Sequence, residues 1–194
     1  MPPSNADTGG VTDEDLAARA AAGDEPAFTA LIRRLKEPAY RFARLHTGDP
    51  DEAYDVVQEA FVSAWKNLAR YDPSRRFSTW LFQITLNKCR DRARRRKVRQ
   101  FFYQARDLDH AANRADAGMP DPEQQLGTGQ QAARLEAEIG ALPEGLRSAF
   151  VLAAVEQHSH QETAAILGIS PKSVEMRVYR ARKHLQARLE NPDA

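Results

Sequence analysis

The residue types best suited to chemistry in this sequence are arginine and lysine, and they gather in two segments. Residues 75–99 hold ten basic side chains and one acid, Asp91, for a local charge of +9. Residues 172–188 hold six basic side chains and Glu175, for +5, although the whole chain carries only +1. Because neutralised phosphates are the main sequence-independent source of affinity for nucleic acids, the two segments predict a polyanion bound at two places.

No catalytic or metal-binding pattern competes with this interpretation. Ser148, Ser159 and the five histidines form no nucleophile elbow and no acid–base pair. His158 and His160 stand two residues apart and lack a second pair of ligands, so together with Cys89 they do not make a zinc motif. We therefore expect no metal, no cofactor and no enzymatic activity.

The composition also indicates where the protein works. A single cysteine excludes an internal disulfide and fits a reducing compartment. No apolar run approaches the roughly 20 residues of a membrane span, and the polar N-terminal stretch has no secretory signal pattern. The sequence predicts a soluble, cytoplasmic protein with no direct membrane insertion.

The second basic segment has the pattern of a helix-turn-helix over residues 161–182. Ala164 is small where two helices would cross, Gly168 permits the positive φ of a tight turn, and Ser170 with Pro171 starts the second helix. A buried seam is expected at Val174, Val178, Ala181 and Leu185. The outward face then carries Lys172, Ser173, Glu175, Met176, Arg177, Tyr179, Arg180 and Lys183, which suits a helix in the major groove. The alternative is a plain solvated helical hairpin.

The first basic segment interleaves cations with aromatic side chains. Phe77, Trp80 and Phe82 stand among Arg75, Arg76, Asn87, Lys88 and Arg90. Aromatic faces and cations together suit unstacked bases and their backbone, so single-stranded DNA is a plausible ligand. The competing interpretation is that Trp80 and Phe82 are ordinary core and that the arginine run is a solvated helix end.

Helical periodicity throughout predicts an all-α protein of two small domains. We expect a disordered tail at 1–11, a bundle at 12–100, a flexible acidic linker at 101–130 and a second bundle at 131–190. The first bundle should contain a helix from Thr12 to about Ala22, another after Asp24 with a kink or break at Pro38, a third after Pro50 and a fourth from about Ser78.

The third helix has two distinct faces. Its predicted core arc comprises Ala53, Tyr54, Val57, Ala60, Phe61, Ala64, Trp65 and Leu68. The opposite face carries Asp55, Gln58, Glu59, Val62 and Lys66. A valine among acids and amides is unusual on a helix face that contacts only solvent.

Four strings give the chain a specific resemblance: DEAYDVVQEAFVSAW at 51–65, FSTWLFQITLN at 77–87, LPEGLR at 142–147 and VYRAR at 178–182. In this order they resemble the sigma subunits of bacterial RNA polymerase, in the compact extracytoplasmic-function (ECF) group with two globular domains. The resemblance implies a transcription initiation factor that binds core RNA polymerase and promoter DNA. It also implies an anti-sigma factor as a further partner.

The resemblance implies roles for the surfaces already described. Asp55, Gln58, Glu59 and Val62 would dock on the clamp helices of the largest polymerase subunit, and the flap of the second-largest subunit would be a further contact. A flipped base of the −10 element would be captured near Arg75, Arg76, Phe77, Ser78, Thr79 and Trp80, with Asn87 and Arg90 beside the upstream duplex. The helix from Pro171 would read the −35 element with Lys172, Ser173, Glu175, Met176, Arg177, Tyr179 and Arg180.

Two positions depart from the family pattern. Glu175 stands where many members have Arg or Lys, which predicts a different −35 base, with a cytosine amine as a suitable donor. Thr163 stands where a bulky aliphatic is usual, so the first helix of the motif should pack differently.

The alternative function, from another class of protein, is that of a stand-alone transcription regulator. Such a regulator would bind duplex DNA without polymerase, which would distinguish it.

Overall fold

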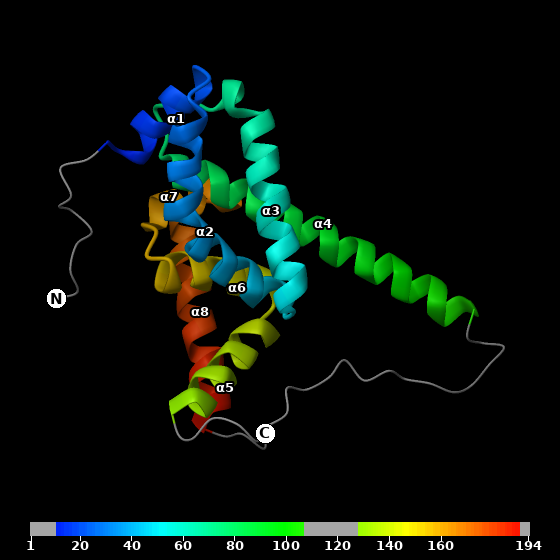
Figure 1. Cartoon of the computed structure of the whole chain (residues 1–194). Coiled ribbons are helices and arrows are strands. Elements are labelled where there is room, and N and C mark those ends of the chain that lie inside the picture. Colours follow the sequence, from blue (N-terminus) through cyan, green and yellow to red (C-terminus); the bar gives the residue numbers. More distant parts are fainter. Residues whose placement is uncertain (1–10, 107–127, 191–194) are drawn as a thin grey trace.

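A computed structural model describes residues 11–106 and 128–190. The predicted tail therefore lies outside the described residues except for Val11, as do residues 107–127 of the predicted linker. Within the described ranges every regular element is helical, as predicted. The elements are α1 (Asp13–Ala21), α2 (Glu25–Thr47), α3 (Pro50–Lys66), η1 (Leu68–Arg70), α4 (Phe77–Arg106), α5 (Thr128–Ala141), α6 (Glu144–Phe150), η3 (Val151–Val155), α7 (His160–Leu167) and α8 (Pro171–Glu190) (Figure 1).

Each of the first three helices starts at a residue whose side chain caps it. Thr12 forms a capping box with Asp15, Asp24 accepts a hydrogen bond from the Ala27 amide, and Asp49 caps α3. Of the kink or break expected at Pro38, the break is wrong, since α2 is one helix from Glu25 to Thr47 with Pro38 inside it. Residues on both sides of the proline are buried in the core, which offsets the lost backbone hydrogen bond.

The buried face of α3 is rotated from the predicted arc. Ala53, Val57, Ala60, Phe61 and Ala64 are buried as expected. However, Tyr54 is 46% exposed and Trp65 is 39% exposed, whereas Val56 is 1% exposed. The arc shifts because α2 and α4 both pack on α3, so the covered stripe is centred between them.

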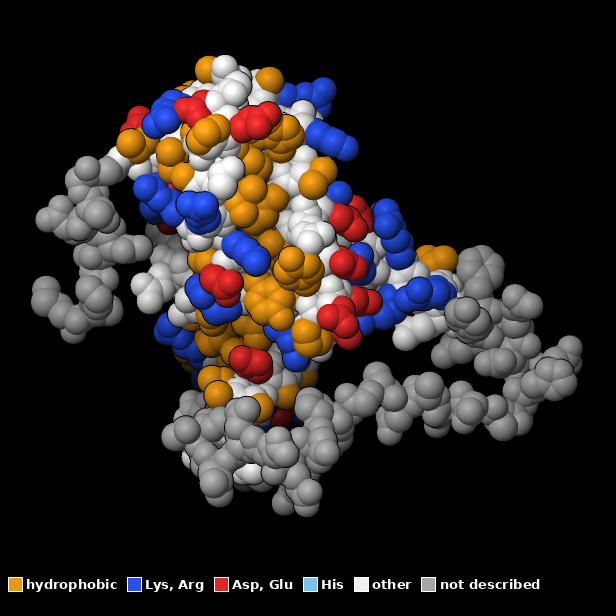
Figure 2. Space-filling model, viewed as in Figure 1, with side chains coloured by type: hydrophobic (Ala, Val, Ile, Leu, Met, Phe, Trp, Pro, Cys, Tyr) orange, Lys and Arg blue, Asp and Glu red, His pale blue; other side chains and the backbone are white. Residues whose placement is uncertain are grey.

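The helix α4 is longer than predicted. It runs to Arg106, so the first six residues assigned to the linker, 101–106, are helical. Figure 1 shows its second half leaving the bundle. Lys88, Arg92 and Arg96, four residues apart on one face, pair with acids of α3 and so tie α4 to α3 as far as Arg96. In Figure 2 acidic and basic side chains lie next to each other where α3 and α4 meet.

The N-terminal half (residues 12–106) and the C-terminal half (residues 128–190) pack directly on each other. One buried cluster contains Phe42 and Phe82 from the first half and Leu142, Leu152 and Leu185 from the second. The cores predicted for two separate bundles are therefore continuous. A smaller cluster of Ala149, Ala164, Val174 and Val178 lies inside the helix-turn-helix.

Candidate nucleic-acid and protein interfaces

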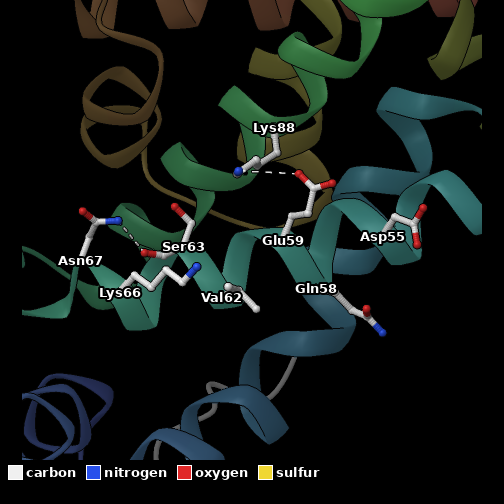
Figure 3. Close-up of a pocket in the computed structure, with 8 residues that line it drawn as sticks. All are labelled: Asp55, Gln58, Glu59, Val62, Ser63, Lys66, Asn67 and Lys88. Carbon is white, nitrogen blue, oxygen red and sulfur yellow. Dashed lines mark hydrogen bonds and ion pairs between the residues drawn. The ribbon is translucent and has the colours of Figure 1, made fainter.

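The outward face of α3 forms a shallow groove of about 550 Å³ that is lined by acidic, basic and polar side chains and by one valine. Val62 lies between Gln58 and Lys66 on this face and is 52% exposed (Figure 3). The groove is lined by Asp55, Gln58, Glu59, Val62, Ser63, Lys66, Asn67 and Lys88. All four residues predicted for docking line it, so α3 brings them together as the periodicity indicated.

Basic residues of α4 hold the acids of this groove. Arg92 lies 3.2 Å from Asp55 and 3.4 Å from Glu59, and the Lys88 ammonium lies 3.6 Å from Glu59. These exposed pairs contribute little to folding stability. They fix the positions of two carboxylates around an exposed valine, an arrangement suited to a protein partner with basic and apolar side chains.

The residues predicted for the −10 element range from exposed to fully buried. Arg75, Arg76 and Asn87 are exposed and Arg90 is half-buried, whereas Phe77 is fully buried and Thr79 is 7% exposed. Phe77 therefore has no free face on which a base could stack, and Phe82, at 2% exposure, is core. Ser78 and Trp80 are half-buried. They are the residues of the loop and first turn that combine partial exposure with proximity to the cations.

Aromatic contacts fix the start of α4. The Trp80 ring lies 5.4 Å from Tyr71 and 5.6 Å from Phe77 between centroids. The Phe77 amide donates to the Glu14 carboxylate at 3.1 Å, which ties this helix start to α1. Burial, followed by the charge of Glu14, raises the pKa of Tyr71 to about 12, so its hydroxyl stays protonated and donates to the Arg75 carbonyl. These contacts hold both ends of the loop between η1 and α4.

The helix-turn-helix has the predicted internal construction. Ser159 and Glu162 form a capping box on α7, and Gly168 takes a φ of +66° at the turn. The Ser173 amide donates to the Ser170 hydroxyl at the start of α8. The predicted seam of Val174, Val178, Ala181 and Leu185 is buried, which confirms it. The hairpin is therefore packed and capped, and its outward face is presented on a fixed helix.

The outward face of α8 is largely open. Met176 is 41% exposed and Tyr179 is 53% exposed, and Lys172, Glu175 and Arg180 are also exposed. Lys172 pairs with Glu175 at 3.0 Å, so the unusual acid is partly neutralised within its own helix.

Arg177 behaves differently from the rest of this face. It is half-buried, and a Cβ built on Gly145 would lie 3.3 Å from its guanidinium. Arg177 therefore packs sideways against α6 rather than projecting outward. Ser173 is also half-buried at the start of the helix. The cations of this face that project outward are therefore Lys172, at the start of α8, and Arg180, further along the helix.

A second groove lies beside α8 and was not predicted from the sequence. It has a volume of about 390 Å³ and is lined by His160, Glu175, Met176, Val178, Tyr179 and Arg182. His160 comes from α7 and the rest from α8. Helical spacing places Glu175, Tyr179 and Arg182 on one side of α8, but the approach of His160 depends on the crossing of the two helices.

A buried polar contact joins the two halves. The Nε2 atom of His46 lies 3.0 Å from the Ser148 hydroxyl, and Nδ1 lies 2.8 Å from the Phe42 carbonyl, to which it donates. Burial lowers the pKa of His46 to about 4, so the imidazole is neutral near pH 7. The His158 ring meets Phe82 edge to face at 4.8 Å. The sequence carried no signal for either contact, because the partners are distant along the chain.

Comparison with known proteins identifies the class of protein to which the chain belongs. Sigma-70 region 2 matches residues 31–99, and sigma-70 region 4 matches residues 132–185. The RNA polymerase sigma factor CnrH of Cupriavidus metallidurans is 42% identical over 92% of this chain and 94% of that protein. Further relatives carry the name ECF RNA polymerase sigma factor.

Two solved structures resemble the whole fold. CnrH in complex with the cytosolic domain of CnrY has a TM-score of 0.70 and 36% identity, covering 94% of this chain and 99% of that one. The sigma factor RpoE in complex with the anti-sigma factor NepR, from Bartonella quintana, has a TM-score of 0.62 and 26% identity, covering 85% and 99%. The sigma factor in each complex has the same fold as the present chain.

The chain belongs to the sigma-70 family, in its ECF group of RNA polymerase sigma factors. It is thus a transcription initiation factor and not an enzyme in its own right. Over the described ranges there is no cluster of three or more potential metal ligands, and no helix there is long and apolar enough to cross a membrane.

Proposed function

We propose that the α3 groove docks on the clamp helices of the largest polymerase subunit, and that the C-terminal half contacts the flap of the second-largest subunit. Val62 supplies the apolar centre of the α3 groove, and Asp55 and Glu59 supply its charge. A solvent-exposed valine with flanking carboxylates is the observation that supports a protein ligand here. The proposal places the protein in the cytoplasm, where polymerase and promoter DNA are its ligands.

The proposal assigns promoter recognition to two surfaces. Arg75, Arg76, Ser78, Trp80, Asn87 and Arg90 would hold the melted −10 element, with Phe77 and Thr79 as buried support. The exposed face of α8 would read the −35 element, with Lys172, Ser173, Glu175, Met176, Tyr179 and Arg180 near the bases or phosphates and Arg177 as a lateral support. The capped recognition helix with its open basic face is the single observation that carries the assignment.

Run-off transcription with bacterial core polymerase tests this function. The full chain should direct transcription from a subset of promoters, whereas a chain ending at residue 130 should lose the −35-dependent part. If Arg180 contacts a base, Arg180→Ala should weaken binding by about 1–3 kcal/mol at promoters that carry the contacted base in the −35 element, and less at promoters that lack it. Equal losses at every promoter would restrict Arg180 to phosphate.

The same assay separates this function from that of a stand-alone regulator. A regulator binds its duplex operator without polymerase, whereas a sigma factor of the proposed kind needs the core enzyme. An anti-sigma factor is proposed as a further partner, since the related RpoE was solved with the anti-sigma factor NepR. Failure of the purified chain to associate with core polymerase would refute the docking proposal.

A further inference from the structure

The three acids in the first turn of α1 have different partners. Asp13 lies 2.8 Å from Arg34 on α2, and Asp15 belongs to the capping box of its own helix. The Glu14 carboxylate instead accepts a hydrogen bond from the Phe77 amide at 3.1 Å. Glu14 is half-buried and Phe77 is fully buried, so this bond is partly shielded from water. Glu14 therefore joins α1 to the first residue of α4.

The start of α4 needs an acceptor from elsewhere in the chain. The first four amides of an α-helix have no partner within the helix, and an oxygen-bearing side chain at the N-cap position usually accepts from one of them. In α4 that position is held by Arg76, whose carbonyl accepts from the Trp80 amide at 3.3 Å and whose guanidinium has no acceptor atom. The Glu14 carboxylate takes the place of a local cap, and its charge suits the positive end of the helix dipole.

The first turn of α4 carries residues that the proposed function places against melted DNA. Ser78 and Trp80 are half-buried there, and the Trp80 ring packs against the rings of Tyr71 and Phe77. Phe77 thus contributes twice, because its amide binds Glu14 and its ring contacts Trp80. A change in the position of Phe77 would therefore change how the Trp80 ring is presented.

Contacts that do not involve Glu14 hold α1 in the bundle. Leu16, Ala17 and Ala20 are buried in the core, and Asp13 pairs with α2. Removing the Glu14 carboxylate should therefore leave α1 in place. The helix α1 also precedes residues 31–99, so Glu14 lies outside the segment that matches sigma-70 region 2.

We propose that Glu14 is a positioning residue for promoter opening, because its carboxylate fixes the Phe77 amide and, through the Phe77 ring, orients Trp80 toward the melted −10 strand. This inference rests on the proposed role of Ser78 and Trp80 at the −10 element. Glu14 acts through Phe77 and need not touch DNA. Its loss should slow strand opening but leave binding to core polymerase unchanged, since the groove proposed for docking is formed by α3 and Lys88.

The test is promoter opening by holoenzyme, on a promoter that the wild-type holoenzyme transcribes and that carries 2-aminopurine in its −10 element. Glu14→Ala removes the acceptor and should slow opening about three- to tenfold, as expected for the net loss of one hydrogen bond. Glu14→Asp keeps the charge but is one methylene shorter, and it should show a similar loss. Glu14→Gln keeps an acceptor oxygen at the same reach and should stay within about twofold of wild type.

Asp13→Ala is the matched control. It removes a carboxylate from the same turn of α1 and breaks the ion pair with Arg34, but leaves the Phe77 amide bound to Glu14. Its opening rate should stay within about twofold of wild type, because an exposed ion pair contributes little. If Glu14→Ala fails to fold, as judged by circular dichroism, Glu14→Asp retains an acid in the first turn and carries the test.

A second measurement follows Trp80 in the free protein. The chain has two tryptophans, so Trp65→Phe leaves Trp80 as the only one. In this background acrylamide should quench Trp80 more strongly in Glu14→Ala and Glu14→Asp than in Glu14→Gln or Asp13→Ala. A role in stability alone would not produce this order well below the melting temperature.

Equal opening rates for Glu14→Ala and wild type would overturn the inference. An equal loss in Asp13→Ala would also overturn it, because a general loosening of α1 would then explain the effect, and so would a parallel loss of binding to core polymerase. Trp80→Ala in the same holoenzyme separates the two levels. No loss there refutes the −10 assignment itself, whereas a loss there with unaltered opening in Glu14→Ala refutes only the positioning role.

Discussion

The Arg92 guanidinium lies 3.2 Å from the Asp55 carboxylate and thereby links the long helix α4 to the groove proposed for polymerase docking. The same guanidinium lies 3.4 Å from Glu59. The groove is thus positioned by the helix that also begins at the proposed −10 site. The proposed docking groove and the proposed −10 site are therefore both in contact with α4, the first near the middle of the helix and the second at its start.

Replacing both Asp55 and Gln58 with alanine should weaken binding to core polymerase by about 1–2 kcal/mol, because the proposed docking surface loses one of its two carboxylates and an amide. Stability should fall by less than about 1 kcal/mol, since the pair with Arg92 is exposed. Competition against another sigma factor for core enzyme measures the effect. Glu37→Ala, an exposed acid on α2, is the control, and equal behaviour of the two variants would remove the groove from the docking surface.

Thr163→Val should stabilise the protein by about 1 kcal/mol. Thr163 is fully buried, and its hydroxyl has no hydrogen-bond partner, so the valine removes an unpaired polar group at nearly constant shape. Thr85→Val is the matched control, because that hydroxyl is equally buried but donates to the Leu81 carbonyl at 2.9 Å. The free energy of unfolding in urea should rise for Thr163→Val and should fall or stay the same for Thr85→Val. A loss of stability in Thr163→Val would contradict the expectation.

Gly168→Ala should destabilise the helix-turn-helix by about 1 kcal/mol, because an alanine at φ +66° is strained even though its Cβ would meet no atom within 4 Å. Gly140→Ala gives the comparison, since this glycine lies within α5 and its Cβ would be 3.9 Å from the Leu45 carbonyl. Helical alanine should be neutral or stabilising there. Thermal melts of both variants decide the matter, and equal melting temperatures would argue against strain at the turn.

Stability should fall as the pH drops from 6.5 toward 4, because His46 must stay neutral in the folded protein. Its pKa is lowered to about 4, whereas an unfolded histidine titrates near 6.5, so the unfolded chain binds more protons in this window. His46 should contribute about 2 kcal/mol of the loss between pH 7.5 and pH 5. Urea titrations at both pH values measure it.

His46→Leu is the appropriate variant for this experiment. It lowers stability near pH 7.5, since the Ser148 hydroxyl loses one of its partners, but the difference between pH 7.5 and pH 5 should shrink by about 2 kcal/mol. The smaller remainder would come from His158, whose pKa burial also lowers. An unchanged pH dependence in His46→Leu would show that another group is responsible.

The sequence predicted those features that depend on neighbours within one or two turns. Thr12 and Ser170 cap helices as expected, and the seam of α8 is buried. Errors arose where packing outweighed local preference. Pro38 lies inside a continuous helix because the core holds both segments, and Tyr54 and Trp65 are exposed because two helices share the opposite side of α3.

The sequence by itself determined the all-helical class, the helix-turn-helix and the two basic segments, because periodicity, caps and charge are written in adjacent residues. Only the tertiary structure decided that Arg76 meets Glu162 and that Arg41 meets Glu156, since these partners are 86 and 115 residues apart. Periodicity identifies a face but not its partner. Which charges meet depends on how the two halves bury their apolar surfaces together, and that is a property of the whole folded chain.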